Sequence, residues 1–272
     1  MSEYELPLVF FTVFTQWGIG GVLALTLYQL NAGRKAEPAL SHQQIKYTAL
    51  GLWLVEVLGS SLSMAHLGSP FEAYRVVLGL GHSWLSREAV LFIVLNGGML
   101  LWLLACWFRP QNKALQSALG LVITALGIVA ILSSAQIYAQ MALHPLWHTP
   151  FTQVAFLGTP LLLGFTTLGI VLNACGLNVS RLIRGGMLAG IVMVLVALAG
   201  RYQIDGASTL GVLLWWQICG SILIAAAMFT LLRTRVHLSP TLAIVAGAMI
   251  VSGEVVGRML FYNNVMSQFP WC

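Results

Sequence analysis

The chain has 272 residues, of which 58% are apolar and only 8% carry a formal charge. Soluble domains carry roughly 25% charged residues, so this composition excludes a soluble globular enzyme and predicts an integral membrane protein. The net charge of +5 comes from basic residues that stand singly or in pairs between apolar stretches, which excludes a nucleic-acid-binding protein with a basic run.

Eight apolar stretches are long enough to cross a bilayer as helices, because about 20 residues span a hydrocarbon core of about 30 Å. In chain order they cover residues 7–31, 46–66, 87–108, 113–140, 150–175, 181–200, 209–232 and 240–262. The connections are short, and the N-terminus is acidic where a cleavable signal peptide would be basic. We therefore expect residues 1–272 to form a single domain, an all-α integral membrane bundle of eight transmembrane helices.

The distribution of basic residues predicts the orientation of this bundle. Most of the thirteen basic residues fall in the connections that follow the first, third, fifth and seventh spans: Arg34, Lys35, Lys46, Arg109, Lys113, Arg181, Arg184, Arg233 and Arg235. The remainder fall on the opposite side: Arg75, Arg87, Arg201 and Arg258. By the positive-inside rule, both termini are expected outside, which is the periplasm for a multi-pass protein of the bacterial inner (cytoplasmic) membrane.

Small and aromatic residues in and beside the spans have structural interpretations. Glycines that suit close helix packing, because they let backbones approach, are Gly18, Gly20, Gly21, Gly158 and Gly164. Tryptophans at span ends, typical of an interface belt, include Trp84, Trp107, Trp147 and Trp271.

The most informative ionisable residues are His66, at the end of the second span, and Glu88, at the start of the third. A charge inside the bilayer costs about 2.5–3.5 kcal/mol on insertion scales, so the few that are retained usually have a task. A histidine and a carboxylate at the same end of adjacent helices are suited to hydrogen-bond a small redox molecule and to accept its protons. The structural alternatives are a solvated helix cap for His66 and an interfacial charge at a helix N-terminus for Glu88.

Further polar residues are expected in the same outer half of the membrane, where they could face one cavity. Gln16 lies in the first span, and Glu254 and Arg258 are an i,i+4 pair on one face of the last span, followed one turn later by Tyr262. The structural alternative for the pair is an ion pair, which lets a bilayer tolerate both charges. Glu56, in the middle of the second span, is either a hydrogen-bonding packing residue or, like Glu254, a proton-relay residue.

We expect no cofactor that is bound permanently. A membrane haem needs histidines on facing helices, whereas the six histidines here all lie in connections or at span ends. The four cysteines are scattered without a C-x-x-C pair, which argues against an iron–sulfur cluster or a zinc site. The sequence therefore predicts no haem and no metal.

Several blocks of residues, distributed over most of the chain, resemble a known family. They are Pro7-Leu8, Phe11-Thr12-Val13-Phe14 with Gln16, Gly51-Leu52-Trp53, Ser63-Met64 followed by His66-Leu67-Gly68-Ser69-Pro70, Ser86 with Glu88, the run from Gly158 to Gly164, and Glu254-Val255-Val256-Gly257-Arg258 followed by Phe261-Tyr262. In these blocks the chain resembles the eight-helix membrane anchor subunit of dimethyl sulfoxide reductase-type molybdoenzymes (the DmsC family). More distantly, it is similar to the NrfD and polysulfide reductase anchors.

The resemblance implies an electron-transport function in anaerobic respiration. An anchor of this family has no redox centre of its own; it oxidises menaquinol to menaquinone and passes the electrons to an iron–sulfur subunit, which feeds a molybdopterin catalytic subunit. The quinol-site histidine and glutamate of the family match His66 and Glu88, and we expect Gln16, Arg258 and Tyr262 to complete the quinol site. Two alternatives stay open at this point: a structural membrane anchor without a quinol site, and an ion or proton transporter.

Overall fold

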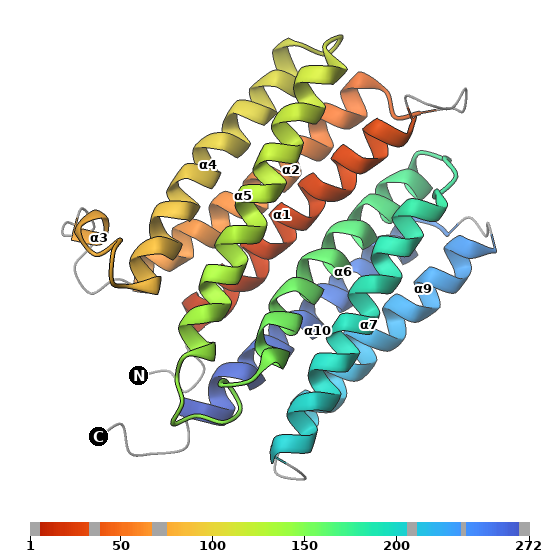
Figure 1. Cartoon of the computed structure of the whole chain (residues 1–272). Coiled ribbons are helices and arrows are strands. Elements are labelled where there is room, and N and C mark those ends of the chain that lie inside the picture. Colours follow the sequence, from red (N-terminus) through yellow and green to blue (C-terminus); the bar gives the residue numbers. More distant parts are fainter. Residues whose placement is uncertain (1–5, 33–38, 67–74, 206–210, 235–237, 267–272) are drawn as a thin grey trace.

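The eight apolar stretches are helical in the described residues, apart from Gln140, Cys175 and Gly211 at their ends. The structure is a computed structural model that describes residues 6–32, 39–66, 75–205, 211–234 and 238–266. Seven continuous α-helices are α1 (Leu6–Ala32), α2 (His42–His66), α4 (Trp84–Phe108), α5 (Lys113–Ala139), α6 (Pro150–Ala174), α7 (Arg181–Asp205) and α10 (Pro240–Met266). The remaining long helix is built from α8 (Val212–Trp216), the π-helical segment η3 (Gln217–Leu223) and α9 (Ile224–Arg233), and a short helix, α3 (Arg75–Leu78), precedes α4. The long helices lie side by side and run antiparallel along the chain (Figure 1).

Seven of these long helices are long and apolar enough to cross a membrane, as judged within the described residues. The helix that is not among them is α2, which has 25 residues but carries Lys46, Glu56 and three serines. These polar residues lower the apolar character of α2 without shortening it. Seven of the eight predicted spans are therefore confirmed as candidate membrane helices, and the crossing of the membrane by α2 stays a prediction.

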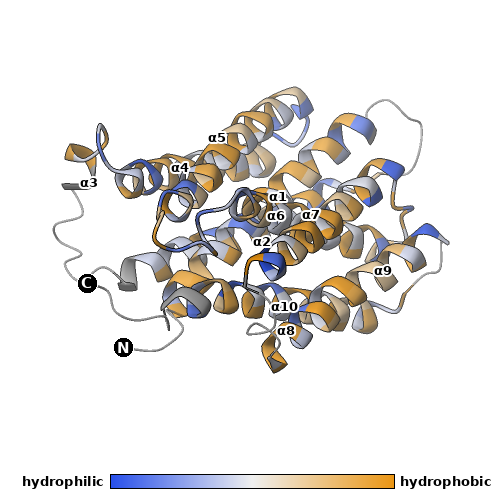
Figure 2. Ribbon diagram, turned by 60° about the horizontal axis from the view of Figure 1, so that its bottom comes forward, coloured by the Kyte–Doolittle hydropathy of each residue, from blue (hydrophilic) through white to orange (hydrophobic). Residues whose placement is uncertain are grey.

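Apolar residues make up most of the helical ribbon (Figure 2). Many of the apolar side chains are exposed on the outside of the bundle, whereas several polar side chains are buried inside it. Large apolar side chains that are at least half exposed include Ile93, Leu101, Val122, Val129 and Val245. Buried polar side chains include Gln16, Glu56, Glu88, Glu254 and Arg258. This distribution is the one expected when lipid, rather than water, surrounds the bundle, because ionisable groups then face the interior. The chain is a multi-pass membrane protein.

The two ends of the bundle differ in charge. α1 begins and α10 ends at the same end, which we call the terminal end (Figure 1). At the opposite end, which we call the distal end, lie the basic residues Lys46, Arg109, Lys113, Arg181, Arg184 and Arg233. This arrangement agrees with an even number of crossings, whereas the side of the membrane that each end faces stays a prediction.

Glycines bring α1 and α6 into close contact at the centre of the bundle. α1 packs against α2, α5 and α6. A Cβ atom at Gly20 would overlap the backbone of Pro160, and one at Gly164 would overlap the backbone of Gly20. A Cβ atom at Gly18 would overlap the side chain of Glu56, and one at Gly21 would overlap that of Leu52, both on α2. The predicted helix-packing role of these glycines is confirmed, since only glycine leaves room for the opposing helix.

Candidate functional site

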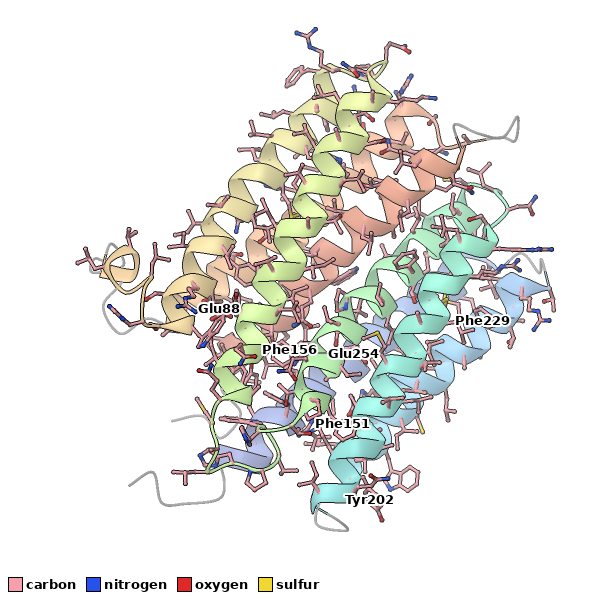
Figure 3. All side chains as sticks on the ribbon, viewed as in Figure 1. Glu88, Phe151, Phe156, Tyr202, Phe229 and Glu254 are labelled. Atoms are coloured by element: carbon pink, nitrogen blue, oxygen red, sulfur yellow. The ribbon has the colours of Figure 1, made fainter. Side chains whose placement is uncertain are left out.

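Glu88 lies in the second turn of α4 and is buried, with 7% of its surface exposed (Figure 3). The Ser134 hydroxyl of α5 donates a hydrogen bond to its Oε1 atom. In the part of the protein that the structure describes, no basic side chain forms an ion pair with this carboxyl group. The helix itself is capped by Ser83, whose hydroxyl accepts from the backbone N–H of Ser86 at 3.3 Å, so Glu88 is free of the capping role. The alternative of a solvated interfacial charge is wrong for Glu88.

A pair of tyrosines lies beside this carboxyl group. The hydroxyl groups of Tyr138 on α5 and Tyr262 on α10 are 3.2 Å apart, and both side chains are buried. Glu88 interacts electrostatically with both tyrosines, and Thr12 of α1 hydrogen-bonds Tyr262. Sequence reasoning identified Tyr262 but missed Tyr138 and Ser134. Their signal was the i,i+4 spacing of two polar residues on one face of an otherwise apolar span.

Arg258 is the centre of a second buried polar group, between α1, α6 and α10. Its Nη2 atom donates to Oε1 of Gln16 at 2.9 Å and lies 3.5 Å from Oγ1 of Thr159. The guanidinium also lies over the ring of Phe156, 3.9 Å from its centroid, which stabilises a desolvated cation. Gln16 and Arg258 were both predicted site residues, and the structure brings them into direct contact.

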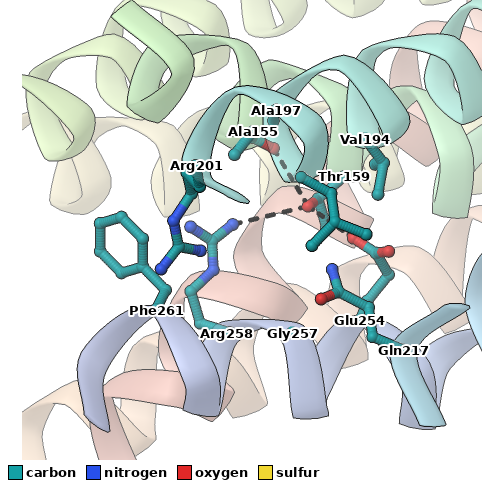
Figure 4. A pocket seen from close by; sticks show the side chains of 11 residues that line it. Ala155, Thr159, Val194, Ala197, Arg201, Gln217, Glu254, Gly257, Arg258 and Phe261 are labelled. Atoms are coloured by element: carbon teal, nitrogen blue, oxygen red, sulfur yellow. Dashed lines mark hydrogen bonds between the residues drawn. The ribbon is translucent and has the colours of Figure 1, made fainter. Parts of the chain in front are cut away.

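The carboxyl group of Glu254 is held by two hydroxyls from neighbouring helices. Thr159 of α6 donates to Oε2 at 2.7 Å, and Ser221 of η3 donates to Oε1 at 2.5 Å. The hydroxyl of Thr159 lies between Glu254 and Arg258 (Figure 4), and these two residues form no direct ion pair in the described structure. The predicted ion pair is wrong, because adjacent helices supply separate partners for each charge. Sequence reasoning missed both hydroxyls: Thr159 lies within the run from Gly158 to Gly164 but was not singled out, and Ser221 lies in none of the blocks named above.

A small cavity of about 30 Å³ opens beside Glu254 and Arg258 (Figure 4). Its polar lining is completed by Thr159, by Gln217 of η3 and by Arg201 of α7, whose guanidinium lies 5.1 Å from the ring of Phe261. A cavity of this volume with several polar partners is large enough for a water molecule. Gln217 packs closely against α10 at this wall, since a Cβ atom at Gly257 would overlap its side chain.

Glu56 belongs to a third polar group, separate from the other two. Its Oε1 atom accepts from Ser60 at 2.9 Å and from Asn96 of α4 at 3.0 Å, and its side chain is fully buried. Its Oε2 atom is buried and has no hydrogen-bond partner within the described ranges. Glu56 shares no direct hydrogen bond with Glu88 or Glu254. These contacts favour the packing interpretation, and the proton-relay interpretation stays a prediction.

His66 is the last residue of α2, at the terminal end, but its side chain lies outside the described residues. Trp147 is 1% exposed rather than interfacial: its Nε1 donates to the carbonyl oxygen of Phe261 at 2.7 Å, and the two rings stack. The belt interpretation is therefore wrong for Trp147, and Trp271 lies outside the described part of the protein.

The side chains that the structure describes form no group of three or more His, Cys, Asp or Glu residues that could hold a metal ion. The described cysteines, Cys106, Cys175 and Cys219, are free thiols.

Comparison with known proteins agrees with this architecture. The family described as DMSO reductase anchor subunit (DmsC) matches residues 1–263. The protein is 28% identical to the C component of the anaerobic dimethyl sulfoxide reductase of Escherichia coli (strain K12), over 97% of this sequence and 96% of that relative. It is 28% identical to the corresponding component from Haemophilus influenzae, over the same shares of both sequences. It is 30% identical to the C component of the sulfite dehydrogenase of Allochromatium vinosum, over 62% of this sequence and 61% of that relative.

No solved structure matches the protein. The family match extends from the first residue to beyond Tyr262, so it includes every polar group described above. The chain belongs to the DmsC family, the anchor subunits of DMSO reductase.

Proposed function

We propose that this protein is the membrane anchor and menaquinol-oxidising subunit of a respiratory molybdenum reductase. The observation that carries the proposal is the buried carboxyl group of Glu88, held by Ser134 beside the Tyr138–Tyr262 pair near the terminal end of the bundle. Burying an acidic group there without a cation in contact costs free energy. A role in proton exchange would explain why the protein keeps this group.

Oxidation of a quinol releases two electrons and two protons and leaves the quinone. A carboxylate is a suitable acceptor for one quinol O–H, and a neutral histidine is suitable for the other. In our proposal Glu88 accepts one proton and His66, at the adjacent end of α2, accepts the second. The hydroxyl of Ser134 orients the Glu88 carboxyl group, so that one oxygen remains available for the quinol.

The neighbouring polar residues would line the head-group site. We assign Tyr262, which interacts electrostatically with Glu88, to the wall of this site. Gln16 and Arg258, which hydrogen-bond each other, lie behind that wall. In this arrangement Glu254 and Thr159 position Arg258 rather than touch the quinol.

The partners follow from the family and from the relatives' names. We propose that electrons leave the terminal end to an iron–sulfur subunit and continue to a molybdopterin catalytic subunit, which reduces dimethyl sulfoxide or a related acceptor. The basic distal end supports an orientation in which the terminal end faces the periplasm of a bacterial cell. Protons would then be released on the side where the reductase consumes them.

The test is quinol-driven reduction of the iron–sulfur clusters in the co-purified complex, followed by EPR. We expect Glu88→Gln, which keeps the side-chain size but removes the proton acceptor, to abolish cluster reduction while the complex still assembles. Ser134→Ala should slow it, whereas Ser133→Ala, a buried neighbour on the same helix, should not. Equal cluster reduction in wild type and Glu88→Gln would refute the site. Assembled wild-type complex that does not respond to quinol would leave a purely structural anchor as the function.

A further inference from the structure

A long apolar groove lies where α10 faces α1 and α6. It has a volume of about 630 Å³. Its walls are formed by residues of α1 between Phe10 and Trp17, of α6 between Leu163 and Val171, and of α10 between Ile244 and Val256. Ile244 is 63% exposed, so the groove reaches the surface that the protein presents to lipid.

The polar atoms in the groove are mostly engaged within the protein. Thr167 accepts a hydrogen bond from Nε1 of Trp17 at 2.7 Å and donates to the backbone of its own helix. The hydroxyl of Ser252 donates to a backbone carbonyl and accepts from Nε1 of Trp216. Only the buried hydroxyl of Thr166 lacks a partner among the lining residues described. A groove without a charged side chain cannot hold a charged head group, and it fits a hydrocarbon tail instead.

One face of α10 connects this groove to Arg258 and Tyr262, which lie nearer the terminal end. Ile244, Ala248, Val251 and Val255 follow one another at spacings of three or four residues, which places them on a single helix face. The same spacing continues to Arg258 and then to Tyr262. The apolar stripe therefore leads directly to the residues that hydrogen-bond Gln16 and Tyr138.

We infer that this groove binds the isoprenoid tail of the quinol, with the tail running from the head-group site toward the distal end. The inference rests on the proposed function. Beyond it, α1, α6 and α10 are the helices that would make the protein prefer a quinol with a tail. The residues from Ile244 to Val256 extend about 18 Å along α10 at 1.5 Å per residue, which accommodates several isoprenoid units. The direction is also the one a tail requires, since it runs from the bundle end into the hydrocarbon region.

The test compares two substrates in the intact complex: a naphthoquinol without a tail and the same quinol with an isoprenoid tail. Val251→Trp and Ala248→Leu reduce the groove volume without touching the head-group residues. We expect both variants to raise the KM for the tailed quinol at least tenfold, with little change in kcat. For the quinol without a tail, kcat and KM should stay at the wild-type values. The matched control is Val245→Trp, on the same helix but outside the groove, which should leave both substrates unaffected.

The outcomes separate this inference from the proposed function. If the two groove-filling variants, Val251→Trp and Ala248→Leu, oxidise the tailed quinol with unchanged KM, the groove holds only surrounding lipid and the inference is overturned. If both substrates lose activity equally in both filled variants, the groove does not discriminate between them and the inference fails as well. If the wild-type complex oxidises neither quinol, it is the proposed function that fails.

Discussion

The hydroxyl of Thr159 makes a sharp test of the buried polar groups, because a second threonine on the same helix provides the opposite case. Thr159 donates to Glu254 and lies next to Arg258, and it is 4% exposed. Thr166, two turns further along α6, is 2% exposed and its hydroxyl has no partner among the described residues. Valine replaces a threonine hydroxyl by a methyl group of nearly the same size, so the two substitutions differ mainly in the hydrogen bond that is lost.

Leaving a buried partner unsatisfied costs about 1–3 kcal/mol, and hydrogen bonds between membrane helices contribute about 0.6 kcal/mol on average and up to about 1.7. We therefore expect Thr159→Val to lower the free energy of unfolding by about 1–2 kcal/mol, and Thr159→Ser to recover most of the loss. Thr166→Val should be neutral or stabilising, because it removes a buried hydroxyl that has no partner.

The assay is equilibrium unfolding of the purified protein in mixed micelles with increasing sodium dodecyl sulfate, followed by far-ultraviolet circular dichroism. The quantity of interest is the difference between the two valine variants. An equal loss at both positions, or a larger loss at Thr166, would show that the hydrogen bond to Glu254 does not contribute to stability.

Two further predictions concern packing. Gly164→Leu should prevent stable assembly of the bundle, because any side chain there overlaps the backbone of Gly20. Gly97→Ala should be tolerated, because an added Cβ atom there meets nothing within 4 Å. The yield of monodisperse protein in detergent distinguishes the two variants. Trp147→Phe keeps an aromatic ring against Phe261 but removes the Nε1 hydrogen bond, so we expect a loss of about 1 kcal/mol in the same unfolding assay. A loss as large as that expected for a Trp→Ala cavity, about 3–5 kcal/mol, would contradict this account of Trp147.

The helices were predictable because membrane spans are determined by local properties. The length of an apolar run and the rise of 1.5 Å per residue are sufficient to locate a span, and all eight predicted ranges are helical where described except for single residues at an end. α2 is the instructive exception. Glu56 and Ser60 hydrogen-bond each other, and Asn96 of α4 completes their hydrogen bonds, which no inspection of α2 alone reveals.

The candidate site was predictable in part. Glu88, Arg258, Gln16 and Tyr262 stood out because ionisable and amide groups are rare inside apolar spans, and the structure buries all four. The hydroxyl partners did not stand out, because serine and threonine occur throughout the spans and most of them bond the backbone of their own helix, as Thr124 does.

The sequence by itself determined the class of protein, the helical spans, the unequal charge of the two ends and the rare polar residues, since each depends on residue type and spacing alone. Only the tertiary structure decided which polar groups meet. The rotation of α6 and the π-helical turn of η3 bring Thr159 and Ser221 to Glu254, so the carboxyl group is held by two hydroxyls instead of by Arg258, its neighbour on the same helix. The hydrogen-bond partner of a buried side chain depends on how helices far apart in the sequence are rotated and how closely they approach. Those are properties of the packed bundle.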